Sequence, residues 1–419
     1  MSNEKFIPLS VPNMAGNEWK YVKDCLDTGW ISSVGAYVTQ FENMVAAFAG
    51  AKYGVAAVNG TSALHISLLL SGVKQNDYVI LPNLTFVASA NSIKYLGAEP
   101  ILIDADPDMW QMDLDLLEEF LENETDELGG YLIYKKDGRR IGAIMPVHIL
   151  GNMCDMDRFL AIVKKYPLPI VEDATEALGT TYKGISAGNF SPLACFSFNG
   201  NKIISTGGGG VIVTNDEALA KQAKHLTTTA KASADEYYHD EVGYNYRLVN
   251  VLAAIGVAQM ELLPLFIKRK KEIVDFYKKE LTGVADIRFQ KELPEVNANG
   301  WLFTIQTEQQ QQLLDYLNEN KILSRRFWMP MNKLPMYNEC IYINNKDNSD
   351  YIYNTCLSIP SSTSITDEEL AIVVKEIRDR FDDPKPARNT ISTVLKVLEK
   401  KGYVDHRAYA NVFLYYPLV

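Results

Sequence analysis

The 419-residue chain has few cysteines and few histidines, and neither residue type clusters. The cysteines are odd in number, lie far apart and include no CxxC pair: Cys25, Cys154, Cys195, Cys340 and Cys356. This spacing signals neither a disulfide framework nor a zinc site. The five histidines are equally scattered, so the sequence predicts that the protein is not a metal enzyme.

Long hydrophobic runs and an excess of positive charge are also missing. No stretch approaches the roughly 18 apolar residues of a membrane-spanning helix, and Glu4 and Lys5 precede any apolar run, so we expect a soluble cytoplasmic protein with no membrane partner. The 41 Lys and Arg against 52 Asp and Glu leave a net charge of −11, which repels polyanions and makes nucleic acid an unlikely partner. The 47% hydrophobic and 22% charged residues argue against disordered, collagen-like and coiled-coil classes.

From about residue 50, short apolar runs alternate with amphipathic stretches. This alternation predicts an α/β fold, in which helices cover a mostly parallel sheet. Seven strands are expected at residues 53–58, 78–81, 100–103, 143–148, 169–173, 194–198 and 210–214. Helices are expected at residues 62–71, 87–96, 113–121, 156–165 and 216–227, and residues 131–144 read as a β-hairpin that turns at Asp137-Gly138.

The pattern changes after Gly256. A long helical stretch is interrupted by Pro264, and the mixture of strands and helices after Val284 predicts a smaller second lobe. We therefore expect a large domain over residues 1–260 and a small domain over residues 261–381. Residues 382–419 begin with Asp-Asp-Pro-Lys-Pro and are interpreted as a linker and a tail.

Two polar segments follow expected strands, where ligands collect in open α/β sheets. Asn59-Gly60-Thr61-Ser62 enters a helix whose first N–H groups can hold an anion, although the same residues also make an ordinary N-cap. Asp173 ends an apolar strand, and a buried carboxylate requires a cationic partner. An N-cap or a structural salt bridge is the alternative interpretation for Asp173.

Two further segments carry Lys202 and Phe86. Lys202 lies between the strand at 194–198 and four consecutive glycines at 207–210, a setting that lowers the pKa of an amine and favours Schiff-base chemistry, although most lysines are solvated surface residues. Phe86 either stacks on a planar ligand or fills the core. An anion cradle, a carboxylate for a pyridinium nitrogen, a reactive lysine and an aromatic ring are together what pyridoxal phosphate requires.

These motifs resemble those of the DegT/DnrJ/StrS family of sugar-nucleotide aminotransferases over residues 6–380. The segments that carry the resemblance are GWISS at 29–33, NGTSALH at 59–65, LTFVA at 84–88, VEDA at 171–174, SFNGNK at 197–202 and GYNYR at 243–247. The resemblance implies fold type I of the PLP-dependent transferases (aspartate aminotransferase-like), with a seven-stranded mostly parallel sheet and a smaller α+β lobe. The segment SFNGNKIISTGGGG resembles that of the branch of the family that aminates C4 of UDP-4-keto-6-deoxy-N-acetylhexosamines for bacterial surface glycans.

The resemblance also implies roles for individual residues. Lys202 would bind pyridoxal phosphate and carry a proton between L-glutamate and the cofactor, and Asp173 would keep the pyridine nitrogen protonated. Phe86 would stack on the ring, and Glu176 would stand near the cofactor's hydroxyl, where many relatives have Gln or His. The expected phosphate ligands are Gly60, Thr61, Ser62 and Ser197, joined by Asn245 from the other subunit of a homodimer with shared active sites.

The expected contacts to the UDP-ketosugar are Trp30, His148, Lys231, Arg247 and Arg325. His148 could equally be a core residue, and each of the basic residues is more often found on a protein surface. Lys202 further separates the chain from the sugar dehydratases of the same family, which have His there.

The last residues do not fit this family. Residues 387–419 resemble the recognition helix (389–401) and the wing (402–419) of the β-lactamase-repressor winged helix, without room for its preceding helices. A complete, basic module is what groove readers need, so we interpret the tail as a fused remnant or a docked segment rather than a DNA reader. A PLP-binding transcription regulator that uses this tail is the alternative function.

Overall fold

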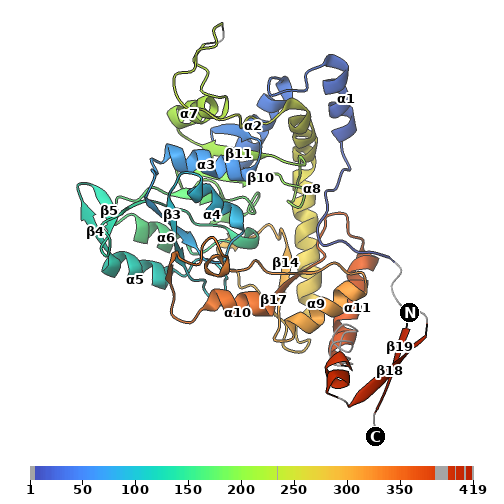
Figure 1. Ribbon diagram of the computed structural model, residues 1–419. Coiled ribbons are helices and arrows are strands. Elements are labelled where there is room, and N and C mark those ends of the chain that lie inside the picture. Colours follow the sequence, from blue (N-terminus) through green and yellow to red (C-terminus); the bar gives the residue numbers. More distant parts are fainter. Residues whose placement is uncertain (1–4, 234, 383–394, 402, 410–411, 418–419) are drawn as a thin grey trace.

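The computed structural model describes residues 5–233, 235–382, 395–401, 403–409 and 412–417. Its centre is a mostly parallel sheet (Figure 1). The strands are β1 (Tyr53–Ala57), β11 (Gly210–Thr214), β10 (Leu193–Ser197), β7 (Val171–Asp173), β6 (Arg140–Ile144), β2 (Tyr78–Pro82) and β3 (Glu99–Ile103), in that order. Parallel bridges from Ile144 to Ile170 and from Val147 to Asp173 join the two halves. The seven expected strands are confirmed. Among them, β11 runs opposite to the other six.

Smaller strands extend this sheet. The expected hairpin is confirmed as β5 (Tyr131–Tyr134) and β6, and β4 (Thr125–Leu128) pairs with β5. At the other end, β16 (Ile341–Ile343) adds to β3 in parallel. A separate three-stranded sheet contains β8 (Thr181–Tyr182), β9 (Ile185–Ser186) and β13 (Val296–Asn297).

The five expected helices of the large domain also form. They are α3 (Gly60–Leu70), α4 (Val87–Lys94), α5 (Leu114–Glu124), α6 (Met156–Val163) and α7 (Glu217–Thr227). The side chains of Asp113, Asp155 and Asp216 accept backbone N–H bonds at the starts of α5, α6 and α7, which satisfies donors that a helix leaves unpaired. Two helices precede the sheet, α1 (Glu18–Thr28) and α2 (Ala36–Ala49).

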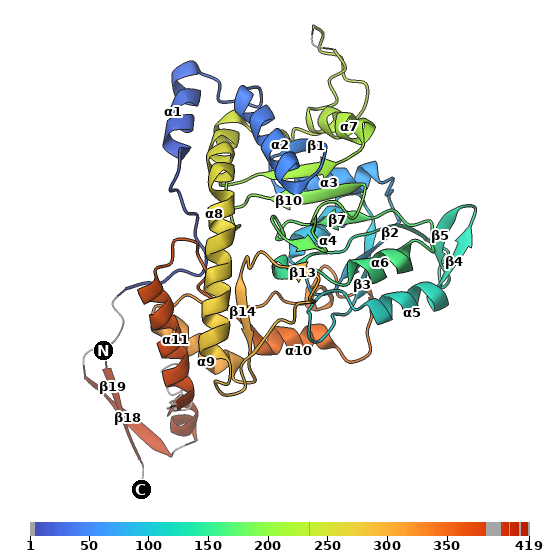
Figure 2. The ribbon, with the colours of Figure 1, turned by 180° about the vertical axis from the view of Figure 1, so that it is seen from behind.

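The longest helix, α8 (Asn250–Leu281), links the two parts of the chain. The expected interruption at Pro264 is wrong, because the helix continues through it while packing against α1, α2 and the last helix of the small lobe. Figure 2 shows α8 running from the side of α1 and α2 toward that of α11 (Asp367–Asp382). The predicted domain boundary at residue 260 falls inside this helix.

The length of α8 corrects the expectation that no stretch approaches a membrane span. By length and composition α8 passes as a candidate span, the one such helix among the described residues. Its buried side chains include Val257, Leu263 and Phe266, which pack in the main hydrophobic core. We therefore interpret α8 as the core helix of a folded domain.

The small lobe is an antiparallel sheet covered by helices. Its strands are β12 (Arg288–Phe289), β14 (Phe303–Gln306), β17 (Cys356–Ile359) and β15 (Arg325–Arg326), and its helices are α9 (Gln310–Glu319), α10 (Asn348–Thr355) and α11 (Asp367–Asp382). Short 3-10 turns occupy Ile149–Gly151 and Met331–Lys333. Thr366 and Glu369 form a reciprocal capping box at the start of α11, with N–H bonds of 2.9 and 3.2 Å. A second hydrophobic core joins this sheet to the end of α8 through Ile273, Tyr277 and Leu281.

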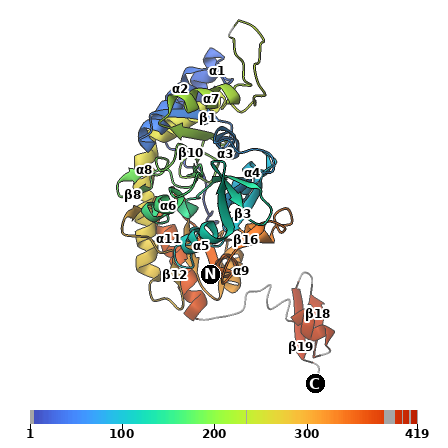
Figure 3. The same ribbon diagram turned by 90° about the vertical axis from the view of Figure 1, so that its left-hand side faces the viewer.

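Part of the tail lies within the described residues. Residues 395–400 are helical, and β18 (Val404–Tyr409) pairs antiparallel with β19 (Val412–Pro417), as Figure 3 shows. This agrees with the expected helix and hairpin where both are described. Residues 389–394 of the expected helix lie outside the described residues.

Candidate active site

The four predicted segments meet in one cavity of about 520 Å³, where the sheet faces the small lobe. Parallel strands bring their carboxyl ends to the same edge, which explains why segments more than a hundred residues apart converge. The large domain lines the cavity with Asn59, Gly60, Thr61, Phe86, Asp173, Glu176, Ser197 and Lys202. The small lobe adds Trp301, Arg325, Arg326 and Trp328.

The start of α3 forms one wall of this cavity. The side chain of Asn59 accepts the N–H of Ser62 at 2.8 Å, so the N-cap interpretation is correct for that group and the Ser62 N–H does not face an anion. Thr61 still lines the cavity. A Cβ at Gly60 would lie 2.9 Å from the Cβ of Ser197, so only glycine allows α3 and β10 to approach this closely.

Asp173 is buried at the end of β7 and points its carboxylate into the cavity. One oxygen accepts the Ser89 hydroxyl at 2.7 Å, and the other accepts the Thr175 N–H at 3.1 Å. Among the described residues no cationic side chain pairs with Asp173 within 4 Å, so the expected cationic partner is not a protein ion pair. The Asp173 carboxylate is therefore suited to accept a hydrogen bond from a protonated ring nitrogen that a cofactor supplies.

Lys202 and Glu176 form a buried pair beside Asp173. The Lys202 Nζ lies 3.6 Å from one Glu176 oxygen, and the other oxygen accepts the Leu150 N–H at 2.8 Å. Burial lowers the pKa of the Lys202 amine, although the charges of Glu176 and Asp173 oppose this shift. Burial also raises the pKa of Glu176 to about 7, against the effect of Lys202. The lowered amine pKa agrees with the sequence prediction and favours the nucleophilic form of Lys202.

The shifted pKa of Glu176 makes stability depend on pH. In the unfolded chain Glu176 loses its proton around its ordinary pKa of 4.5, whereas in the folded protein it keeps the proton up to about pH 7. Stability from this group is therefore complete below pH 4.5 and is lost as pH rises through 7. Relative to Glu176→Gln, the cofactor-free wild type should lose on the order of 2 kcal/mol between pH 5 and pH 8.

Urea unfolding of both proteins at the two pH values measures this difference. The exposed Glu127→Gln is the matched control and should follow the wild type at both pH values. Parallel pH dependence in wild type and Glu176→Gln would show that Glu176 titrates as an ordinary surface carboxyl.

Aromatic side chains close the cavity from the small lobe. Phe86 is half exposed at the start of α4, and its ring centre lies 6.5 Å from that of Trp328. Trp328 stacks on Trp301 at 6.2 Å, and the Trp301 ring centre lies 4.0 Å from the Lys202 Nζ. Sequence reasoning missed Trp301 and Ser89 and gave Trp328 no role. Trp301 lies in an irregular segment with no motif around it, so only tertiary structure reveals its position.

Of the expected sugar contacts, Arg325 lines the cavity and the others do not. Trp30 and Arg247 line a separate cavity of about 660 Å³ next to α1 and α2. The guanidinium of Arg247 is buried and donates to Glu42 at 2.8 Å and to the Ala56 carbonyl at 3.0 Å, and its expected contact to the sugar nucleotide stays a prediction. His148 is a core residue, bonded through Nε2 to Glu172 at 2.8 Å.

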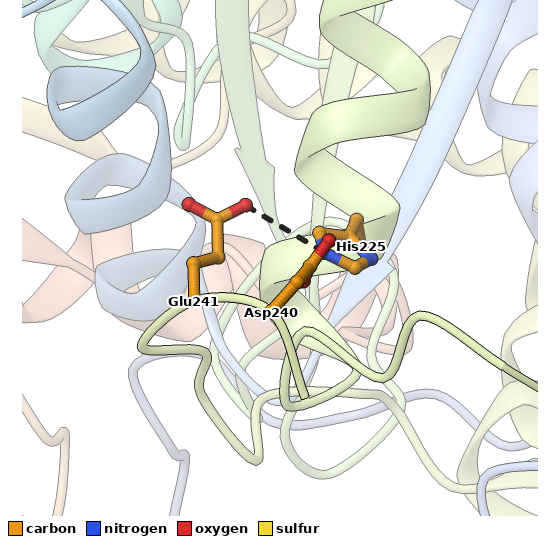
Figure 4. A group of neighbouring side chains, drawn as sticks. All are labelled: His225, Asp240 and Glu241. Carbon is orange, nitrogen blue, oxygen red and sulfur yellow. Dashed lines mark hydrogen bonds and ion pairs between the residues drawn. The ribbon is translucent and has the colours of Figure 1, made fainter. Parts of the chain in front are cut away.

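Lys231 and Asn245 belong to the loop between α7 and α8 and do not line the Lys202 cavity. Asn245 is exposed, and its expected contact with a partner subunit stays a prediction. Figure 4 shows that Asp240 and Glu241 of this loop converge on His225 at the end of α7. The His225 Nε2 lies 2.7 Å from Asp240 and 3.6 Å from Glu241, which fixes the loop to the helix.

Two groups of side chains in the described part of the chain have the composition of a metal site. They are His225, Asp240 and Glu241, and Glu399, Asp405 and His406. All six side chains are partly or largely exposed, and their contacts are those of an imidazole paired with carboxylates. The prediction that the protein is not a metal enzyme stays a prediction.

The tail matches a second family. Residues 365–419 match the penicillinase repressor family, which starts earlier than the expected residue 387 and therefore includes α11. The apolar residues Leu370, Val373 and Ile377 of α11 are buried in the core of the small lobe. Because α11 is part of this lobe, it is not free to serve as a helix of a winged-helix domain, and the regulator alternative is not favoured.

Most of the chain matches one enzyme family. Residues 12–378 match the DegT/DnrJ/EryC1/StrS aminotransferase family. The GDP-perosamine synthase of Escherichia coli O157:H7 is 38% identical over 382 residues, which are 90% of this chain and 100% of the relative. A putative pyridoxal phosphate-dependent aminotransferase, EpsN of Bacillus subtilis, is 35% identical over 90% of this chain and 96% of its own length.

Solved structures share the fold. A putative sugar aminotransferase of Streptococcus pneumoniae in its PLP form superposes with a TM-score of 0.81 at 24% identity, over 90% of this chain and 99% of that one. The same protein is also known in its PMP form. With the cavity, the buried lysine and the full-length relatives in agreement, the chain belongs to the DegT/DnrJ/EryC1/StrS family and is a PLP-dependent sugar aminotransferase of fold type I.

Proposed function

We propose that the protein transfers the amino group of L-glutamate to C4 of a nucleotide-linked 4-keto-6-deoxyhexose for bacterial surface glycan synthesis in the cytoplasm. The observation that carries this proposal is the position of Lys202. Its amine, with a pKa lowered by burial, lines the same cavity as Gly60 and Thr61 at the start of α3 and the carboxylate of Asp173, which forms no ion pair among the described residues.

Several residues of the cavity have tasks in this reaction. Pyridoxal phosphate, when bound there, would supply an electron sink that eases removal of the α-proton of the amino acid. Lys202 Nζ would attach the cofactor and move this proton, and Glu176, whose carboxylate lies 3.6 Å from that Nζ, would influence the charge of the amine. Asp173 would hold a proton on the pyridine nitrogen, and Thr61 and Ser197 would bind the phosphate. Trp301 and Trp328 exclude water from the reacting atoms.

A second subunit completes this site in our proposal. Asn245 is exposed on a loop that His225 fixes to α7, outside the cavity of its own chain. We infer that Asn245 reaches the phosphate site of the partner in a homodimer. The site is then whole only in the dimer.

The identity of the nucleotide is the finer question. The sequence motifs favour a UDP-linked N-acetylhexosamine, whereas relatives from Escherichia coli, Caulobacter vibrioides and Vibrio cholerae that are 33–38% identical carry the name GDP-perosamine synthase. These relatives match over 80–90% of this chain. We therefore propose a GDP-linked ketosugar as the first acceptor and a UDP-linked one as the competitor.

Turnover with the two acceptors decides between them. With L-glutamate as donor, kcat/KM should be at least about 100-fold higher for the GDP-4-keto-6-deoxyhexose than for the UDP-4-keto-6-deoxy-N-acetylhexosamine, since mismatched polar groups in a buried site cost several kcal/mol. The measurement is 2-oxoglutarate release together with mass detection of the aminated sugar. The reverse preference would restore the UDP-linked acceptor, and no turnover with either sugar would overturn the proposed reaction.

A further inference from the structure

A second buried lysine lies outside the cavity, on α8 between the two lobes. Lys270 is 1% exposed, and its Nζ donates to the carbonyl of Trp301 at 2.7 Å and to the carbonyl of Ser361. Both acceptors are neutral, and within the described ranges no carboxylate forms an ion pair with Lys270. Burying an amine without an opposite charge costs free energy, so an apolar residue would stabilise this position more.

The two carbonyls belong to segments that are far apart in the sequence. Trp301 lies between β13 and β14, just after Gly300, whose φ of +67° a side chain would strain. Ser361 follows β17, and its N–H donates to the carbonyl of Leu9 at 2.8 Å. Lys270 therefore connects α8 directly to two segments, and through Ser361 to the N-terminal segment, at the junction of the lobes.

Trp301 in turn contacts the reactive lysine. Its indole N–H donates to the carbonyl of Asn201 at 2.7 Å, and its ring centre lies 4.0 Å from the Lys202 Nζ. The ring is nearly fully buried and stacks on Trp328. One residue thus separates the buried amine of Lys270 from the amine that attaches the cofactor.

We propose that Lys270 is a positioning residue for Lys202: by holding the Trp301 carbonyl, it fixes the indole ring against the reactive amine. The inference rests on the proposed function in one respect, that Lys202 is the residue to which the cofactor attaches. A methionine would fill the same space without donating hydrogen bonds. The two hydrogen bonds that the amine donates, rather than the volume of the side chain, therefore explain a lysine at position 270.

The surroundings of Lys270 favour its neutral form. Burial lowers its pKa to about 7, and a neutral amine has two N–H groups for the two carbonyls. On α8, Arg269 pairs with Asp367 and Lys271 donates to Asn297. The Tyr277 hydroxyl donates to the Pro360 carbonyl. Residues 299–303 and 360–362, which face Lys270, contain no titratable side chain. A pH dependence of stability that the Lys270→Met substitution removes therefore comes from Lys270 itself.

A double-mutant cycle tests this proposal. Lys270→Met, Trp301→Leu and the double variant are compared for two properties of the holoenzyme. The first is the pH midpoint of the visible absorbance band of bound pyridoxal phosphate without substrate. The second is the single-turnover rate at which L-glutamate bleaches that band. We expect each single variant to shift the midpoint in the same direction and to slow bleaching by about 10-fold, and the double variant to match Trp301→Leu.

Three further variants separate positioning from stability. Lys268→Met removes an exposed lysine of the same helix and should leave rate and midpoint within twofold of wild type. Ile377→Ala weakens the core of the small lobe and should lower Tm without moving the midpoint. Lys270→Gln keeps an N–H donor and should recover part of the rate and of the midpoint.

The unfolding of the cofactor-free protein gives a readout that needs no activity. A lysine whose pKa is lowered by folding makes the folded state more stable as pH rises from about 7 toward its unfolded value. Tm of wild type relative to Lys270→Met should therefore rise between pH 7 and pH 9.

Two results would overturn the role of Lys270 while leaving the proposed function intact. One is a double variant that is slowed by about 100-fold, the product of two independent effects. The other is a Lys270→Met protein with the midpoint and rate of wild type. A wild-type protein that binds pyridoxal phosphate without a visible band would instead overturn the proposed function, and this inference with it.

Discussion

A Lys202→Ala variant is expected to lose amino transfer from L-glutamate by at least about 10⁴-fold, because the residue has two tasks that no neighbour can take over. Its Nζ attaches the cofactor, and it moves the proton at the reacting carbon. Glu176, 3.6 Å away, is the nearest titratable group, but a carboxyl group cannot form the covalent bond to the cofactor. Stopped-flow absorbance after mixing the PLP-loaded protein with excess L-glutamate measures this loss.

Lys202→Arg is the matched control for charge. Arginine keeps a cation beside Glu176 but remains protonated, so it should lose the visible band and the reaction as alanine does. Both variants should still bind pyridoxal phosphate through the phosphate and ring contacts, which equilibrium dialysis detects. Amino transfer by either variant within about 10-fold of wild type would assign the reaction to another amine.

The sequence predicted the residues that depend on strand ends. Asp173 and Lys202 lie next to apolar strands, and topology alone brings the ends of such strands together. Gly60 was also identified, because it stands at a turn from a strand into a helix, and the structure adds that a Cβ there would lie 2.9 Å from the Ser197 Cβ. These local patterns are strong, and the structure places all three residues in one cavity.

The contacts of residues whose position depends on packing could not be predicted from local patterns. Arg247 belongs to a family motif, but its hydrogen-bond partner Glu42 is 205 residues away in the sequence. No local pattern near either residue predicts this pair. Trp301 reaches Lys202 from the small lobe through an irregular segment. Pro264 normally ends a helix, yet tertiary packing holds α8 together across it. In each case long-range contacts decide the structure, and the local sequence does not reveal them.

An Asp173→Asn variant is expected to react with L-glutamate about 10³-fold more slowly than wild type, since an amide cannot balance the charge of a protonated pyridine nitrogen. The substitution keeps the shape of the side chain. The asparagine oxygen can accept the Thr175 N–H, and its amide can donate to the Ser89 hydroxyl, so the fold should be retained. Single-turnover absorbance with L-glutamate measures the rate, and Tm verifies folding.

Ser89→Ala separates the charge of Asp173 from its orientation. This variant removes the 2.7 Å hydrogen bond to one carboxylate oxygen but leaves the negative charge in place. A loss of about 10-fold is expected, because one hydrogen bond to a carboxylate contributes roughly 1.5 kcal/mol. If Asp173→Asn instead lost no more than Ser89→Ala, the carboxylate would act only through its hydrogen bonds. The negative charge at the end of β7 would then have no part in holding the proton on the ring nitrogen.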